Sequence, residues 1–143
     1  MDDIWLALLT TFLTVISGVL VYIFSEIMKE KVLIPLHDYK KLRGKIYFSL
    51  ILYAREISSP LDEKNHTQEA KESYQKAADE FRTFAAELAQ INRELFWGSK
   101  RKKDKRERAW HSLIGLSNSF FGTGDFNHAT IFQDEVRSYL DLR

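Results

Sequence analysis

The chain is 143 residues long, with 45% hydrophobic and 29% charged residues and a formal net charge of +1 at pH 7. This composition is ordinary for one small globular domain with an apolar anchor attached. The absence of cysteine excludes disulfides, thiolate metal sites and cysteine nucleophiles, and it fits a reducing compartment. Six glycines and two prolines are few breaks for this length and favour long helices.

The first predicted element is an apolar helix over residues 4–28. No charged residue occurs from Ile4 to Ser25, a run of 22 positions. At ~1.5 Å per residue such a helix is ~33 Å long, enough to cross a bilayer core of ~30 Å. We therefore expect residues 1–31 to form a transmembrane anchor. Its acidic start and long apolar run are not those of a cleaved signal peptide, so we expect the anchor to be retained.

The charges on the two sides of this run predict its orientation. Asp2 and Asp3 precede it, whereas Lys29 and Lys31 follow it, with further basic residues soon after. Positively charged flanks stay in the cytoplasm. We expect a single-pass protein of the cell inner membrane, with the N-terminus outside and residues 32–143 in the cytoplasm.

One face of the anchor carries small and hydroxyl-bearing residues at helical spacing, namely Ala7, Thr11, Thr14 and Gly18. Small residues allow two helix backbones to approach closely, and threonine can bond across the contact. We predict that this face packs against another membrane helix, in a homo-oligomer. The alternative is that the hydroxyls bond their own helix and the face contacts lipid.

Apolar residues recur at helical spacing through the rest of the chain. Pro35 is expected to kink the chain at the membrane exit, or to occupy the first turn of a new helix. Periodicity and break signals predict helices over residues 37–58, 66–97, 106–121 and 127–142. The second has the most regular seam, alternating by four and three as in a coiled coil or bundle: Ala70, Tyr74, Ala77, Phe81, Phe84, Leu88, Ile91 and Leu95.

The predicted fold is therefore all-α. One N-terminal transmembrane helix is followed by a cytoplasmic helical bundle of about four helices, in residues 32–143. The segments 37–58 and 66–97 are joined by a short loop, so we expect them to form an antiparallel hairpin.

Three apolar segments carry a family resemblance: RGKIYFSLILYA (43–54), FRTFAAEL (81–88) and LIGLSNSFF (113–121). With Pro35-Leu36 they resemble a group of uncharacterised bacterial small membrane proteins. Those proteins have one N-terminal span followed by a helical domain. The resemblance implies a bacterial inner-membrane setting and no particular activity.

No motif predicts catalysis or metal binding. No two of the four histidines lie three or four residues apart, as a helical metal pair would require. The segment GTGDFN (122–127) contains G-x-G, but no lysine follows it as in a phosphate-binding loop. The periodicity places carboxylates on outer helix faces and none on a buried seam. We expect no catalytic residues, no metal and no cofactor; an enzyme is the third hypothesis.

The segment KRKKDKRER (100–108) is the strongest functional indication. It holds seven Lys or Arg residues against two acidic ones, with Trp97 and Trp110 on either side. Since helix 66–97 runs back along helix 37–58, we expect this segment to return to the membrane as a basic loop. Near a membrane surface each cation contributes ~1 kcal/mol of attraction to anionic headgroups. The predicted contact residues are Trp97, Lys100, Arg101, Lys102, Lys103, Lys105, Arg106, Arg108 and Trp110.

Two alternatives to lipid contact remain for this basic segment. One is a solvated loop whose charges only aid solubility. The other, nucleic-acid binding, is disfavoured because the charge is confined to nine residues and no reader motif accompanies it.

These features predict a membrane-anchored helical interaction or scaffold protein without catalytic activity. Its partner would be a protein or a second copy, docked through the helices 37–58 and 66–97. The alternative is an oligomeric membrane effector or small channel, assembled through the transmembrane helix.

Overall fold

The computed structural model describes residues 2–59, 67–95, 98–121 and 126–142. Throughout this part of the chain the regular structure is helical, so the all-α prediction is confirmed. A five-residue π-helical turn, called here the π segment (Lys29–Leu33), interrupts the first long helix. The α-helices are α1 (Asp2–Met28), α2 (Ile34–Leu52), α3 (Ala54–Ser58), α4 (Gln68–Glu94), α5 (Lys100–Ser119) and α6 (Phe126–Tyr139).

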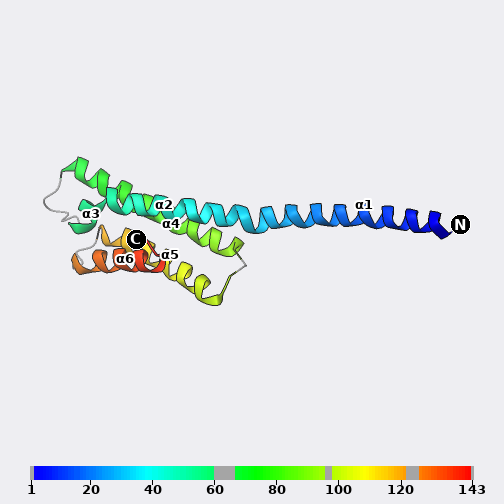
Figure 1. Cartoon of the computed structure of the whole chain (residues 1–143). Helices are drawn as coiled ribbons and strands as arrows, with labels where there is room; N and C mark the ends of the chain where they lie inside the picture. Colours follow the sequence, from blue (N-terminus) through cyan, green and yellow to red (C-terminus); the bar gives the residue numbers. More distant parts are fainter. Residues whose placement is uncertain (1, 60–66, 96–97, 122–125, 143) are drawn as a thin grey trace.

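Helix α1, the π segment and α2 form one continuous helix from Asp3 to Leu52, and α1 projects alone from the bundle (Figure 1). None of its most apolar stretch is buried; Trp5 and Tyr22 are each 70% exposed. Core helices of water-soluble domains bury their apolar side chains, and this one does not. By length and composition, this is one helix that is able to cross a membrane.

The π segment lies directly before Pro35. The Ile34 N–H donates to the Lys29 carbonyl, which is the i→i+5 bond of a π-helix. A proline ring clashes with the carbonyl four residues earlier, here that of Lys31, and the wider π turn makes room for it. Pro35 therefore occupies the start of α2 and is buried there, while the helix continues without a sharp bend (Figure 1). Of the two predictions for Pro35, the first turn of a new helix is confirmed.

The bundle consists of helices that run back and forth beside α2. Helix α4 runs antiparallel to α2, as predicted for the hairpin, and lies between α2 and α5 (Figure 1). Helix α6 packs on α5, and the short α3 contacts α6. Together these four contacts enclose one hydrophobic core.

Helix α4 supplies most of this core through its predicted seam. Ala70 is half-buried, and the other seven residues of the seam are buried. The Phe81 ring stacks on the Phe120 ring with centroids 6.0 Å apart and meets the Tyr53 ring edge-on, also at 6.0 Å. Each aromatic pair of this kind contributes ~0.5–1.5 kcal/mol to stability beyond the burial of its surface. The cluster therefore stabilises the contacts of α4 with Tyr53, which lies between α2 and α3, and with the end of α5.

Several predicted helix limits differ from the structure. The segment 37–58 is two helices, because Tyr53 leaves helical geometry with φ −97° and ψ 20°. The segment 66–97 is helical from Gln68 to Glu94, and Thr67 caps its start by accepting the Ala70 N–H at 3.4 Å. Serine and threonine caps of this kind satisfy the orphan amides of a first turn.

Candidate membrane-facing surface

The basic segment 100–108 is the first part of α5 and not the loop that the sequence predicts. Helix α5 begins at Lys100, six residues before the predicted start near residue 106. A run of charged residues carries no apolar periodicity, so the pattern search placed the helix start too late. The helical rise spreads these nine residues over ~13 Å and over all sides of the helix.

This helix start is electrostatically unfavourable. Its first turn holds Lys100, Arg101, Lys102 and Lys103 and no acidic residue, and the Ser99 side chain makes no capping bond. The N-terminal end of a helix carries about half a positive charge, and a cation there costs roughly 0.3–1 kcal/mol. Local rules of this kind are broken mainly where function requires it.

The exposed members of the segment are mostly cations, with Asp104 and Glu107 exposed among them. The side chains of Lys100, Arg101, Lys102, Lys103 and Arg108 are exposed; we call these five residues the cationic patch. Lys105 is half-buried and pairs with Asp141 at 3.4 Å. Pairing with a carboxylate reduces the attraction of Lys105 to other anions, so the patch excludes it.

Arg106 is buried, which corrects its predicted place at the membrane surface. Only 7% of it is exposed; its Nε donates to Asn92 Oδ1 at 2.8 Å, and its guanidinium lies 5.9 Å from the Tyr39 ring centroid. Burial lowers the pKa of Arg106, while the coulombic interaction with Tyr39 opposes this shift. Burial likewise raises the pKa of Tyr39, against the lowering effect of Arg43 and Arg106. Arg106 thus joins α5 to α4 and α2 inside the bundle.

The two predicted tryptophan contacts have different outcomes. Trp97 lies outside the described residues. Trp110 is half-buried and packs against the hydrophobic core. Its ring is therefore engaged within the bundle, which argues against the predicted headgroup contact.

The cationic patch begins at the end of the bundle where the continuous helix leaves its apolar stretch, with α4 between the patch and that helix (Figure 1). A groove of about 480 Å³ is lined by Glu30, Lys31 and Pro35 on one side and by Arg93 and Glu94 of α4 on the other. The end of α4 therefore lies against the π segment, and α5 starts six residues later at the same end of the bundle (Figure 1). Residues 30–35 lie five to ten positions after Ser25, or ~8–15 Å along the axis.

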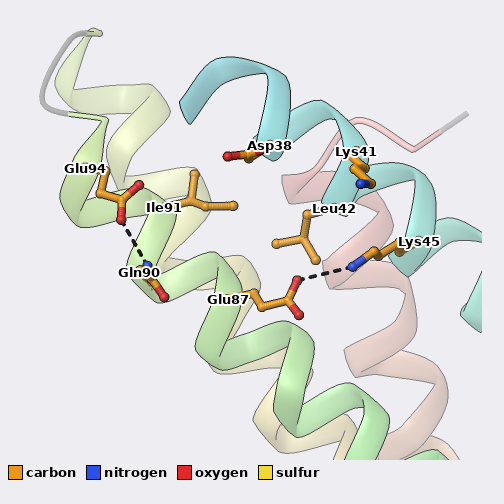
Figure 2. A pocket seen from close by; sticks show the side chains of 8 residues that line it. All are labelled: Asp38, Lys41, Leu42, Lys45, Glu87, Gln90, Ile91 and Glu94. Atoms are coloured by element: carbon orange, nitrogen blue, oxygen red, sulfur yellow. Dashed lines mark hydrogen bonds and ion pairs between the residues drawn. The ribbon is translucent and has the colours of Figure 1, made fainter. Parts of the chain in front are cut away.

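A second groove separates α2 from α4 further along (Figure 2). It measures about 250 Å³, and Leu42 and Ile91 contribute its apolar lining. At its rim Lys45 Nζ pairs with Glu87 Oε2 at 3.7 Å, and both side chains are nearly half exposed. Exposed pairs of this kind contribute less than about 1 kcal/mol. This groove combines charges of both signs, as is typical of a solvated seam between helices.

Carboxylates also enter the helix contacts, which corrects the expectation that none lies on a seam. Glu80 of α4 accepts hydrogen bonds from Ser49 at 2.5 Å and from Tyr53 at 2.8 Å. Burial, the hydrogen bond to Glu80 and the negative charge of Glu80 raise the pKa of Tyr53 to about 12. Similar serine-to-carboxylate bonds join Ser73 to Glu56 and Ser112 to Glu135.

The predicted packing face of the anchor is fully exposed in the single chain. The Thr11 hydroxyl donates to the Ala7 carbonyl and the Thr14 hydroxyl to the Thr10 carbonyl, each at 2.8 Å. No atom lies within 4 Å of a Cβ built on Gly18. The structure thus shows the local bonding named as the alternative, and the helix contact itself stays a prediction.

Comparison with known proteins adds no relative: no protein-family model, curated protein or solved structure matches the chain. Among the described residues, no group of three or more His, Asp or Glu side chains gathers so that it would hold a metal ion. The functional argument therefore depends on the anchor, the cationic patch and the exposed helix faces.

Proposed function

We propose that this chain is a membrane-anchored interaction protein whose helical bundle is held against the cytoplasmic surface of a bacterial inner membrane. In this proposal α1 spans the membrane with Asp2 and Asp3 outside, and the bundle presents its helices to a protein partner. No catalytic step, metal or cofactor is part of it.

The cationic patch is the observation that carries the proposal. Five exposed cations begin at the end of the bundle from which α1 projects, where the groove residues 30–35 lie ~8–15 Å beyond the uncharged run. The headgroup region extends ~5–8 Å beyond the hydrocarbon core, so this end of the bundle lies within about one Debye length, ~8 Å at physiological ionic strength, of an anionic membrane surface, which attracts the start of the patch. The attraction of ~1 kcal/mol per cation exceeds the cost of each cation at the helix start, and it therefore offsets that cost.

The test measures how close the start of α5 lies to lipid headgroups. Since the chain has no cysteine, Ser99→Cys gives a single site for a fluorophore in the full-length protein. We expect headgroup-attached spin labels to quench it strongly in anionic nanodiscs and weakly in zwitterionic ones. Ser58→Cys, at the far end of the bundle in α3 (Figure 1), is the matched control and should remain unquenched.

Charge reversal completes this test. Changing Lys100, Arg101, Lys102 and Lys103 to Glu should reduce the Ser99 quenching in anionic nanodiscs to the zwitterionic level. Quenching that is equal in both lipids, and unaffected by charge reversal, would contradict the lipid contact.

Orientation has its own test. A reporter that works only in the cytoplasm should be active when fused to residue 143, and one that works only in the periplasm should be inactive. The protein should also stay in the membrane fraction after alkaline washing. A periplasmically active fusion would overturn the proposed topology.

The alternative, an oligomeric effector or small channel assembled through α1, has less support. The apolar run of α1 contains no charged residue to mark an ion path. A change in membrane conductance on reconstitution, lost on Thr14→Leu with Gly18→Leu, would favour it.

A further inference from the structure

The outward face of α2 exposes large apolar side chains that none of the described helices of the bundle covers. Tyr47 is 39% exposed, Phe48 64%, Ile51 54% and Leu52 56%. Together with the exposed Gly44 we call these residues the α2 outer face. Isolated apolar side chains on a surface are common, but adjacent ones on one helix indicate a contact site.

Lipid does not cover this face. Phe48 lies 23 residues after Ser25 along one continuous helix, which is ~34 Å beyond the uncharged run. That is more than the whole hydrocarbon thickness of a bilayer, ~30 Å. A protein surface is therefore the occupant that fits.

The π segment sets where this face points relative to α1. Gly44, Phe48 and Ile51 repeat the 4-3 spacing of Ala7, Thr11 and Thr14, 37 positions later in the chain. A single-residue π bulge adds about one residue to the helix, which leaves 36 positions, or ten turns of ~3.6 residues. The α2 outer face and the small-residue face of α1 therefore lie in one straight row on the continuous helix.

Most of the bundle occupies the opposite side of that helix, although Asp141 and Leu142 lie beside Gly44 and Tyr47 at the edge of the row. Ile46, which is fully buried, lies two positions from both Gly44 and Phe48, or ~200° around the axis. Without the π segment the bundle would be rotated by ~100° relative to α1. With it, the row remains uncovered from the membrane to Leu52.

We infer that the occupant of this row is a second copy of the chain, packed in parallel along α1 and α2. The α2 outer face alone is ~14 Å long and ~10 Å wide, far below the ~800 Å² per partner of a stable interface. A partner that forms a stable interface must therefore also cover the small-residue face of α1 inside the membrane. A second copy of the chain carries both this face and the α2 outer face at the same spacing. Membrane insertion makes the two copies parallel, so a two-fold axis brings identical residues together.

Between Gly44 and Leu52, charge is compatible with this self-contact, whereas the exposed Lys40 and Lys41, four and three positions before Gly44, bring like charges together where the row leaves the membrane. From Gly44 to Leu52 the only charged residue is Lys45, and it turns toward α4 to pair with Glu87. Identical apolar side chains therefore meet without a like-charge clash on the α2 outer face. This inference rests on the proposed membrane anchoring, but not on the cationic patch.

Disulfide scanning of the full-length protein in native membranes tests the row. Thr11→Cys, Thr14→Cys, Phe48→Cys and Ile51→Cys, introduced singly, should give several-fold more crosslinked dimer than the off-row controls Leu13→Cys and Lys45→Cys. Because all these positions are exposed in the single chain, the substitutions should leave the fold intact. Absence of crosslinking at both Phe48→Cys and Ile51→Cys would overturn the inference and indicate another protein on the α2 outer face.

A one-residue deletion tests the role of the π segment. Removing Val32 should convert the segment to α-helix and rotate α2 by ~100° relative to α1. Crosslinking at Thr14→Cys should then persist while crosslinking at Phe48→Cys falls to the control level. If both positions still crosslink fully after the deletion, the two halves do not form one row and the inference is wrong. The Ser99 quenching experiment does not depend on either outcome, so failure of the dimer is distinguishable from failure of the proposed function.

Discussion

At the scale of single residues, the same residue type has different roles at different positions. A Cβ built on Gly115 of α5 would lie 2.6 Å from Cε1 of Phe132 in α6, which is closer than two carbon atoms approach. Gly44 has no atom within 4 Å of the corresponding position. The absence of a side chain at Gly115 therefore allows α5 and α6 to pack closely, whereas Gly44 makes no such contact within its own chain.

Gly115→Val should lower the free energy of unfolding by ~1–3 kcal/mol, because the Phe132 ring must move to accommodate the new side chain. The matched variant Gly44→Ala should raise it by ~0.5–1 kcal/mol, since alanine is the better helix former. Chemical unfolding of the detergent-solubilised protein, followed by circular dichroism, measures both. Equal effects at the two positions would show that the α5–α6 contact is looser than described.

Tyr53 should make stability fall at high pH. Its pKa is about 12 in the folded chain and ~10 in the unfolded chain. Below pH ~10 both states hold the proton and this contribution is fully present. Between pH ~10 and ~12 the unfolded chain loses the proton first, so unfolding becomes more favourable as the pH rises.

Tyr53→Phe should remove that part of the pH dependence. At neutral pH it should also cost about 1.5 kcal/mol, because the hydrogen bond to Glu80 is lost. Tyr47→Phe, at an exposed position, serves as the control and should retain the wild-type slope. Thermal unfolding midpoints at pH 9, 10.5 and 11.5 measure the slopes; an unchanged slope in Tyr53→Phe would contradict the assignment.

At the scale of elements, α5 combines a buried face with an exposed cationic one. Arg106 faces inward toward Asn92 and Tyr39, while Arg108 and the first turn face solvent. Neighbouring cations in one charged segment thus have separable effects on stability and on binding.

Arg106→Ala should destabilise the bundle by ~2–3 kcal/mol, because it removes buried packing and leaves Asn92 without its donor. Arg108→Ala should change the stability by less than ~0.5 kcal/mol, as is usual for exposed residues. Urea unfolding of the two variants compares them directly. A similar stability of both would mean that the guanidinium of Arg106 does not contribute to the core.

The double variant Lys100→Glu, Lys102→Glu should separate stability from lipid contact. Acidic side chains favour a helix N-terminus, so we expect a gain of ~0.3–1 kcal/mol for each position. The same variant should lose most of the Ser99 quenching in anionic nanodiscs. Loss of both stability and quenching would indicate that the cations support the fold instead.

The elements differ in how well the sequence predicts them, for physical reasons. The α4 seam was predictable because one face of α4 packs against the bundle along the whole helix, which imposes an unbroken apolar period on the residues of that face. The start of α5 was not, since KRKK has no apolar residue; Ser99 at the N-cap was the one signal in the sequence. The burial of Arg106 depends on Asn92, which lies on another helix, and no local pattern encodes such a partner.

The π segment was also not predictable, although Pro35 indicated a disturbance nearby. KEKVL has no composition that distinguishes a π turn from an α turn. The cationic patch and the membrane anchor, in contrast, are compositional features, so both were located from the sequence. That they lie at the same end of the bundle could be learned only from the fold.

At the scale of the whole molecule, the anchor and the patch should depend differently on salt. At 1 M salt the Debye length falls to ~3 Å, so the quenching of the Ser99 label in anionic nanodiscs should decrease to near the zwitterionic level. The protein itself should stay in the membrane fraction, because apolar burial of α1 does not depend on charge screening. Release of the protein by salt would contradict the transmembrane assignment.

The continuity of the helix from Asp3 to Leu52 also has a mechanical consequence. Leu52 lies 27 residues after Ser25, so the membrane segment is rigidly joined to a lever arm of ~40 Å. A change in tilt of ~20°, within the range of transmembrane helices, would move the far end of the arm sideways by ~14 Å. If α1 spans the membrane as proposed, a change in its tilt is therefore expected to become a displacement at the distal end of the bundle.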